Sequence, residues 1–246
     1  FHDAWFPLEQ VFYMLDALQL HVHVAGYLHC GSYVPYDLLH RVGMNTWAND
    51  VERGWFRRMD AIIVFSQYHR RLLIENLGVN GEKVFVVPFP YMVEELDQYR
   101  SDKKDVQVVW PTRIGPDKDG RLYDRMIKEG FEVVRTFDVC RTKEEYFRLL
   151  GRAQYVATWP NLETFGISAM EGGYLGAGVV VPDKLSYREW YPVRMKDEDM
   201  AVSWIKGGAQ PINEGPWQHA KDGFLRTRQI LDWLANGNLF PHTPYG

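Results

Sequence analysis

The sequence has few cysteines, no long apolar run and no excess of basic residues. Its two cysteines, Cys30 and Cys140, lie far apart in the 246-residue chain, so they predict neither a disulfide framework nor a structural metal site. No stretch reaches the roughly 18 consecutive apolar residues that a membrane span needs. A net charge of −4 gives no overall basic footprint for nucleic acid or anionic lipid. We therefore expect a cytoplasmic protein without a metal or a transmembrane segment.

The composition is that of a globular chain. Hydrophobic residues make up 46% and charged residues 24% of the sequence, which is enough for one large domain or two domains of roughly 100–150 residues. The chain opens on Phe1, without a signal-peptide pattern. We expect it to be a fragment or a processed form of a longer protein.

Helical and β-rich segments alternate through residues 1–94, which we interpret as an amino-terminal lobe. Apolar spacing predicts a helix over residues 8–18, and residues 20–28 predict a strand that ends at His29. Ser66 is typical of a helix cap and Gly78 of a helix stop. The other elements predicted in this part are helices over 47–59 and 67–77 and strands over 61–65 and 84–87.

A second alternation follows a polar linker over residues 95–105. The predicted strands are 106–110, 132–137, 155–159 and 179–181, and the predicted helices are 121–129, 143–152 and 167–175. Strands that alternate with helices indicate a parallel sheet covered on both faces. We expect an α/β protein with two Rossmann-like lobes, the carboxyl-terminal one over residues 106–214. A last helix, about 217–235, is predicted to end at Gly237, in a 215–246 segment expected to pack back on the lobes.

The loop after the strand over residues 106–110 carries two cations, Arg113 and Lys118, five residues apart. Ligands of open α/β sheets bind beyond the carboxyl ends of the strands. Gly115, Pro116 and Gly120 tighten this loop, so both cations could converge on one polyanion, such as a diphosphate leaving group. The alternative is a solvated loop without a ligand.

A pair of glutamates follows the strand over residues 155–159. Glu163 precedes a predicted helix and Glu171 lies about two turns into it. At about 1.5 Å per residue, the eight positions from Glu163 to Glu171 span roughly 12 Å. Amides at the helix start, near Phe165 and Gly166, would face a diphosphate, with sugar hydroxyls at Glu163 and ribose at Glu171. Most helix glutamates are solvated, but Glu171 lies in an apolar helix, so we expect it not to be simply exposed.

Together these motifs resemble those of retaining glycosyltransferases of the GT-B fold, particularly family 4. The resemblance covers about residues 55–185 and rests on Arg and Lys five apart, followed by Glu-x7-Glu with Phe-Gly after the first Glu. It implies a two-lobed, hexose-transferring enzyme with retention of configuration. The family's opening strand and glycine-rich loop are not found before Phe1, so we expect an incomplete amino lobe.

The resemblance also implies roles for individual residues. The residues implied as catalytic are Arg113, Lys118, Glu163 and His29, and those implied as donor-binding are Phe165, Gly166, Ile167 and Glu171. His29 matches a family histidine on the sugar and acceptor side of the cleft, but a core or turn histidine is the alternative. The implied donor is a nucleotide-sugar substrate. No further cofactor or metal is expected, since we identify no Asp-x-Asp pair of the metal-dependent glycosyltransferases and the two cations do the work of a divalent ion. The expected acceptor is a saccharide, a lipid or a small molecule.

Two other functions remain open from the sequence. One is a truncated, non-catalytic module that binds a nucleotide sugar. The other is transfer to hydroxymethylated bases of phage DNA, with aromatic segments over 27–36 and 47–55 lining a groove. The arginines expected there are Arg53, Arg57, Arg58, Arg70 and Arg71. The acidic net charge argues against this second alternative.

Overall fold

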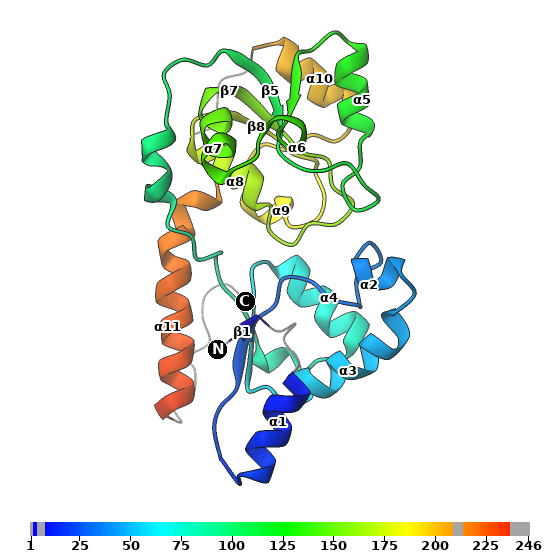
Figure 1. Cartoon of the computed structure of the whole chain (residues 1–246), viewed down its shortest axis with the longest axis vertical. Helices are drawn as coiled ribbons and strands as arrows, with labels where there is room; N and C mark the ends of the chain where they lie inside the picture. Colours follow the sequence, from blue (N-terminus) through cyan, green and yellow to red (C-terminus); the bar gives the residue numbers. More distant parts are fainter. Residues whose placement is uncertain (1, 4–7, 209–213, 237–246) are drawn as a thin grey trace. The chain divides into compact units, whose positions relative to one another are not determined.

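The computed structural model describes residues 2–3, 8–208 and 214–236 and divides the chain into two compact units (Figure 1). Unit 1 comprises Phe1–Pro90 and Asp222–Gly246, and unit 2 comprises Tyr91–Lys221. The sequence-based boundaries lie elsewhere. The predicted linker, residues 95–105, falls inside unit 2, and the predicted 215–246 segment is divided between the units at Lys221.

Unit 1 is built on a four-stranded parallel sheet in the order β1-β2-β3-β4. Its strands are β1 (His2–Asp3), β2 (Ala25–Tyr27), β3 (Ala61–Val64) and β4 (Val84–Val86). All four residues of β3 are buried, as expected for a strand covered on both faces. The predicted strand over 20–28 is wrong over its first half, because residues 20–23 are exposed and only 25–27 enter the sheet.

The helices of unit 1 follow from local signals. They are α1 (Leu8–Ala17), α2 (Leu38–Arg41), α3 (Asn45–Arg58), α4 (Gln67–Leu77), the 3-10 turn η1 (Gly81–Lys83) and most of α11 (Ala220–Asn236). The predicted start and stop of α4 are confirmed. The Ser66 side chain accepts a hydrogen bond from the His69 amide, and Gly78 ends the helix with φ of 67°, a left-handed conformation that favours glycine.

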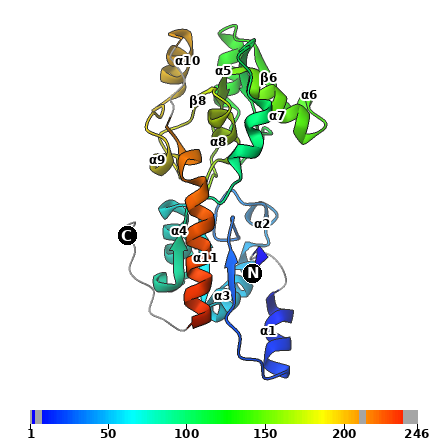
Figure 2. The ribbon, with the colours of Figure 1, turned by 90° about the vertical axis from the view of Figure 1, so that its left-hand side faces the viewer.

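The long helix α11 packs on the strands of unit 1 (Figure 2). The ring of Trp233 lies 5.6 Å from that of Phe85 on β4, and Thr227 shares a 2.6 Å hydrogen bond with the hydroxyl of Tyr27. At Gly223 a Cβ would lie 2.2 Å from the carbonyl oxygen of Pro88. The missing side chain therefore allows this close approach.

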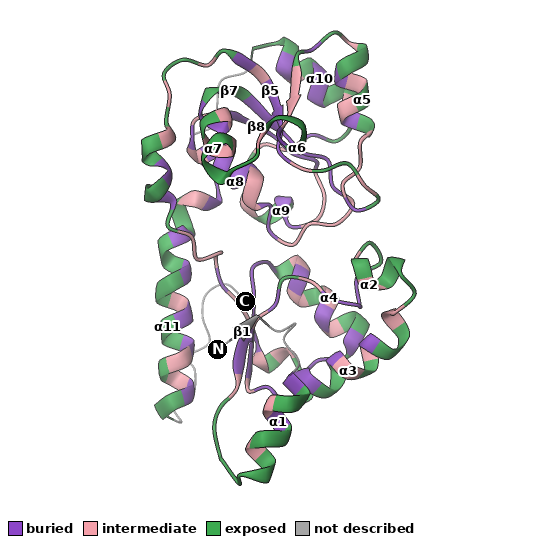
Figure 3. Ribbon diagram, viewed as in Figure 1, coloured by how far each residue is buried: buried purple, intermediate pink, exposed green. Residues whose placement is uncertain are grey.

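Unit 2 holds a parallel sheet in the order β6-β5-β7-β8. Its strands are β5 (Val106–Trp110), β6 (Val133–Arg135), β7 (Ala153–Ala157) and β8 (Gly178–Val180). One face packs against α5 (Arg121–Lys128) and α10 (Glu198–Lys206), and the other packs against α7 (Lys143–Arg152) and α8 (Ile167–Tyr174). The buried strands of this sheet are visible in Figure 3. The remaining helices of unit 2 are η2 (Val93–Tyr99), α6 (Thr136–Val139), α9 (Tyr187–Trp190) and η3 (Pro216–His219).

Some elements of unit 2 differ from their predictions. The predicted strand over 132–137 ends at Arg135, because the chain turns into α6 at Thr136. The helix predicted from 217 is a 3-10 turn followed by α11, and the predicted stop at Gly237 lies outside the described residues. Four of the described α-helices (α2, α6, α9 and α10) were not predicted. In the described part of the chain no helix is both long and apolar enough to cross a membrane.

The strand order identifies where a ligand of unit 2 would be expected to bind. β5 lies at the centre, with β6 on one side and β7 on the other. The connections from β5 and from β7 therefore leave the sheet in opposite directions, which opens a crevice beyond their carboxyl ends. The loop with Arg113 and Lys118 follows β5, and the loop with Glu163 follows β7.

Candidate functional site

The loops that follow β5 and β7 are joined by backbone hydrogen bonds. Lys118 forms isolated β-bridges with Gly115 in its own loop and with Pro160 in the other. The carbonyl oxygen of Asp117 accepts hydrogen bonds from the amides of Asn161 at 2.9 Å and Leu162 at 3.1 Å. These contacts hold the two predicted motifs side by side, although 45 residues separate Lys118 from Glu163 in the sequence.

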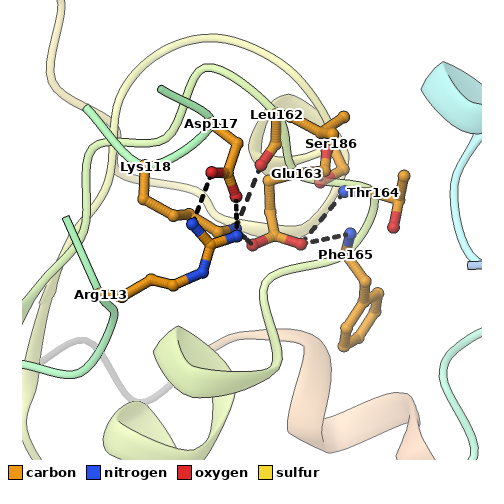
Figure 4. Close-up of polar contacts among 8 residues, drawn as sticks. All are labelled: Arg113, Asp117, Lys118, Leu162, Glu163, Thr164, Phe165 and Ser186. Carbon is orange, nitrogen blue, oxygen red and sulfur yellow. Dashed lines mark hydrogen bonds and ion pairs between the residues drawn. The ribbon is translucent and has the colours of Figure 1, made fainter. Parts of the chain in front are cut away.

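Each predicted cation is paired with a carboxylate (Figure 4). Lys118 Nζ lies 2.7 Å from Glu163 Oε2 and also donates to the carbonyl oxygen of Leu162. Arg113 donates through Nη1 and Nη2 to the two carboxylate oxygens of Asp117, at 2.7 and 2.6 Å. From the sequence we expected both cations to face a polyanion, and we predicted no carboxylate partner for either. An anionic ligand would therefore have to compete with these carboxylates or use the remaining N–H groups.

Glu163 organises the start of α8 as well as binding Lys118. Its Oε1 accepts from the amides of Thr164 at 3.1 Å and Phe165 at 3.4 Å. Its carbonyl oxygen accepts from the Ser186 hydroxyl at 3.2 Å. The Phe165 amide, which was expected to face a diphosphate, therefore already donates to a carboxylate two residues earlier, and its role toward a donor stays a prediction.

Phe165 and Gly166 shape the loop. The side chain of Phe165 is buried and packs edge-on against Trp190, with ring centroids 5.6 Å apart. Gly166 has φ of 93°, and a Cβ there would lie 2.6 Å from a ring carbon of Tyr187. Only glycine satisfies both conditions without displacing the buried tyrosine.

Glu171 is buried, as expected, and held by two tyrosines. It is 6% exposed, and its two oxygens accept from the hydroxyls of Tyr91 and Tyr146, each at 2.7 Å. Burial raises the pKa of Glu171, and the two tyrosine hydrogen bonds and Lys143 oppose this effect. The following Gly172 lets α8 approach β7, since a Cβ there would lie 2.5 Å from Val156.

A cavity of about 320 Å³ lies over these residues within unit 2. Such a volume is at the lower end of small-molecule sites. Four of the eight predicted site residues line it: Lys118, Glu163, Ile167 and Glu171. Sequence reasoning missed the other five, which are Thr112, Lys143, Tyr146, Phe147 and Ser168. Three of these five lie on α7, whose sequence carries no motif, so only the packing of α7 beside α8 brings them to the cavity.

His29 belongs to unit 1, where it follows β2. Its side chain is exposed, and its ring centroid lies 5.4 Å from that of Phe65 and 6.4 Å from that of Phe89. These contacts fix its aromatic surroundings, and its predicted role toward a sugar or an acceptor stays a prediction.

The expectation that the sequence has no Asp-x-Asp pair is wrong, because two such pairs are present. Asp117 and Asp119 bind Arg113 and Arg121. In the second pair, Asp197 caps α10 and Asp199 lies 2.9 Å from Arg125. Among the residues that the structure describes, no group of three or more His, Cys, Asp or Glu side chains is arranged to hold a metal ion. In this structure the first pair, Asp117 and Asp119, therefore forms ion pairs with arginines.

Comparison with known proteins identifies the fold of this chain. No protein-family model and no curated protein sequence matches the chain. Solved structures do match. Sucrose-phosphate synthase from Thermosynechococcus elongatus aligns with 96% of this chain and 73% of its own, with a TM-score of 0.67 and 14% identity. The fold is that of the GT-B glycosyltransferases.

Two further matches contain ligands. Anabaena HepE in complex with UDP and glucose has a TM-score of 0.63 and 13% identity, over 94% of this chain and 83% of its own. The pneumococcal O-GlcNAc transferase GtfA in complex with UDP and GlcNAc has a TM-score of 0.58 and 12% identity, over 92% of this chain and 55% of its own. At such low identity these likenesses establish the GT-B fold and leave the chemistry to be argued from the site.

Proposed function

We propose that this chain is a glycosyltransferase that takes its sugar from a nucleotide-sugar donor bound in unit 2. The observation that carries the proposal is the Lys118–Glu163 pair beside the cavity at the β5/β7 crevice, with Glu171 on the same cavity. A cation, a sugar-binding carboxylate and a second buried carboxylate suit the three parts of such a donor. The UDP and sugar in the HepE and GtfA structures are consistent with this choice.

The proposed chemistry depends on charge that develops as the glycosidic bond breaks. Lys118 and Arg113 stabilise the departing diphosphate, which gains negative charge in the transition state. If a phosphate oxygen accepts the hydrogen bond that Lys118 now donates to Glu163 Oε2, this oxygen becomes available to accept from a sugar hydroxyl. Binding of the phosphate and of the sugar would thus be coupled through one ion pair. Ribose hydroxyls would approach Glu171.

The finer parts of the proposal come from the sequence motifs. We propose transfer of a hexose with retention, as in family 4, because the Arg/Lys and Glu-x7-Glu elements are both present. We propose that the reaction needs no divalent ion, because Lys118 and Arg113 supply positive charge at the diphosphate. The acceptor we propose is a saccharide, a lipid or a small molecule. Two unpaired cysteines are consistent with the cytoplasm.

Release of nucleoside diphosphate from a panel of nucleotide sugars tests the proposal. We expect turnover of at least one donor by the wild type and a loss of turnover in Glu163→Gln, which keeps the shape of the side chain but not its charge. Arg148→Gln, which removes an exposed ion pair with Glu144 on α7, is the matched control and should keep full turnover. If no nucleoside diphosphate is released from any donor, the proposed glycosyltransferase activity is refuted. Binding without release would instead favour the non-catalytic module.

Among the residues that the structure describes, no separate observation favours a DNA acceptor. Arg58 binds Asp16, and Arg70 binds the carbonyl oxygens of Gly81 and Val84. Arg53 donates to the carbonyl oxygen of Asn76. These arginines thus have packing roles within unit 1, and the DNA alternative rests on the sequence alone.

A further inference from the structure

Asp117 occupies a central place in the proposed donor site, although the Arg/Lys and Glu-x7-Glu motifs do not include it. Its side chain is 8% exposed and makes a two-pronged ion pair with Arg113. Its carbonyl oxygen accepts from the amides of Asn161 and Leu162, immediately before Glu163. One buried residue is therefore bonded both to the cation of the β5 loop and to the backbone that carries the glutamate of the β7 loop.

The ion pair leaves most of the guanidinium available. Arginine has five N–H donors, and Asp117 accepts one from Nη1 and one from Nη2. Three donors remain, and the Arg113 side chain is 47% exposed. Asp117 thus fixes the plane of the guanidinium while leaving donors for a phosphate. A two-pronged pair restricts that plane far more than a single contact would.

The neighbouring Gly115 makes room for this arrangement. A Cβ at Gly115 would lie 2.8 Å from Arg113 Nη1 and 3.4 Å from Asp117 Oδ1. Glycine therefore allows the arginine side chain to fold back over the loop. A methyl group at position 115 would displace the guanidinium while leaving the carboxylate of Asp117 in the protein.

We infer that Asp117 is a positioning residue of the donor site: its carboxylate aims Arg113 at the diphosphate and its carbonyl fixes the approach of Glu163. This inference rests on the proposed function. The alternative is a buried ion pair that only stabilises the loop. The two accounts predict opposite changes in anion affinity when the charge of Asp117 is removed. Loss of a negative charge beside an anion site strengthens anion binding by Coulomb's law. Binding weakens only if the loss also misplaces the guanidinium of Arg113.

Pyrophosphate is the probe, since it represents the diphosphate of every nucleotide sugar. Its affinity for the whole chain is measured by titration calorimetry at low ionic strength. We expect Asp117→Asn to bind it about tenfold more weakly than wild type, the effect of misdirecting one charge-assisted contact. In an Arg113→Ala background the same change should no longer weaken binding, because the weakening acts through Arg113 and only the loss of a negative charge remains.

Two further variants complete the test. Gly115→Ala should weaken binding in wild type but not in Arg113→Ala, and it keeps the inference testable if Asp117→Asn unfolds. Asp105→Asn breaks a comparable pair with Arg152 at the opposite end of β5 and should bind pyrophosphate as wild type does. Thermal unfolding of every variant shows whether it is folded.

The outcomes separate the two claims. If Arg113→Ala weakens binding while Asp117→Asn and Gly115→Ala bind as tightly as wild type or more tightly, the positioning role is overturned and the donor site stands. If wild type does not bind pyrophosphate, or if Arg113→Ala binds it normally, the proposed donor site fails and the positioning role fails with it.

Discussion

At the scale of single residues, the proposed function assigns both donor binding and catalysis to the Lys118–Glu163 pair. Both side chains are 18% exposed, and Lys118 also holds the carbonyl oxygen of Leu162. Lys118→Ala would therefore leave the Glu163 carboxylate without its cation as well as removing the charge that we propose acts on the donor. Lys118→Gln also removes the charge, but it keeps hydrogen-bond donors and most of the side-chain volume at this position, so it is the cleaner variant.

We predict that Lys118→Gln lowers kcat by about 10²–10³, as expected for the loss of one electrostatic stabiliser. The KM for the donor should rise much less, because the charge matters most when the leaving group becomes more negative. Steady-state kinetics with the best donor measures both constants. A kcat within about threefold of wild type would remove Lys118 from the chemistry.

Glu171 gives a prediction for stability against pH. Burial raises its pKa above the unfolded value of about 4.5, so folding favours the protonated form. The free energy of unfolding then falls as pH rises from about 4.5 through the folded-state pKa. Glu171→Gln lacks this titration, so its stability relative to wild type should increase between pH 4 and pH 7. Denaturant unfolding at both pH values measures the difference, and a constant or decreasing difference would contradict the account.

At the scale of elements, the close approach of α8 to β7 fixes the position of Glu171. In Gly172→Ala the new methyl group would meet Val156 at 2.5 Å, which we expect to cost about 1–3 kcal/mol through overpacking. The helix should move away from the sheet, so affinity for the donor should fall as well. Gly54→Ala on α3 is the control. Its Cβ would meet nothing within 4 Å, and alanine favours a helix over glycine by about 1 kcal/mol.

The unfolding midpoints and nucleotide affinities of Gly172→Ala and Gly54→Ala test whether the close packing of α8 on β7 positions Glu171. If Gly172→Ala is as stable as wild type and binds nucleotide equally well, the tight packing of α8 has no role in placing Glu171.

Some elements could be predicted from the sequence because local signals were sufficient. The bounds of β5, α4 and α7 are confirmed to the residue. A buried apolar run marks β5, and the helices have side-chain caps at Ser66 and Thr142. The predicted strand over 20–28 failed because its alternation mimics a strand, whereas residues 20–23 contact solvent. Periodicity alone does not report which segment finds a partner strand.

The site was predictable only in part, for a related reason. Lys118, Glu163 and Glu171 belong to motifs that the chain carries in order. Asp117, Tyr91 and Tyr146 gain their importance from contacts with residues as far as 80 positions away. Such contacts depend on the packing of α7, α8 and the two loops, which no local pattern in the sequence specifies.

At the scale of the whole molecule, the GT-B fold is shared with structures that are only 9–14% identical to this chain. At that distance a fold carries no function by itself. The strand order β6-β5-β7-β8 explains why unit 2 has its cavity where it does, and the side chains in that crevice carry the functional claim.

Thermal unfolding of wild type and Lys118→Gln against a panel of nucleoside diphosphates and nucleotide sugars tests that claim most directly. A ligand that binds the folded state stabilises it by about 2.7 kcal/mol at a concentration of about 100 times Kd. We predict that at least one nucleotide stabilises wild type, that Lys118→Gln loses most of the shift, and that Arg148→Gln keeps it. If no nucleotide stabilises wild type, or if Lys118→Gln is stabilised equally, unit 2 does not hold the donor site described above.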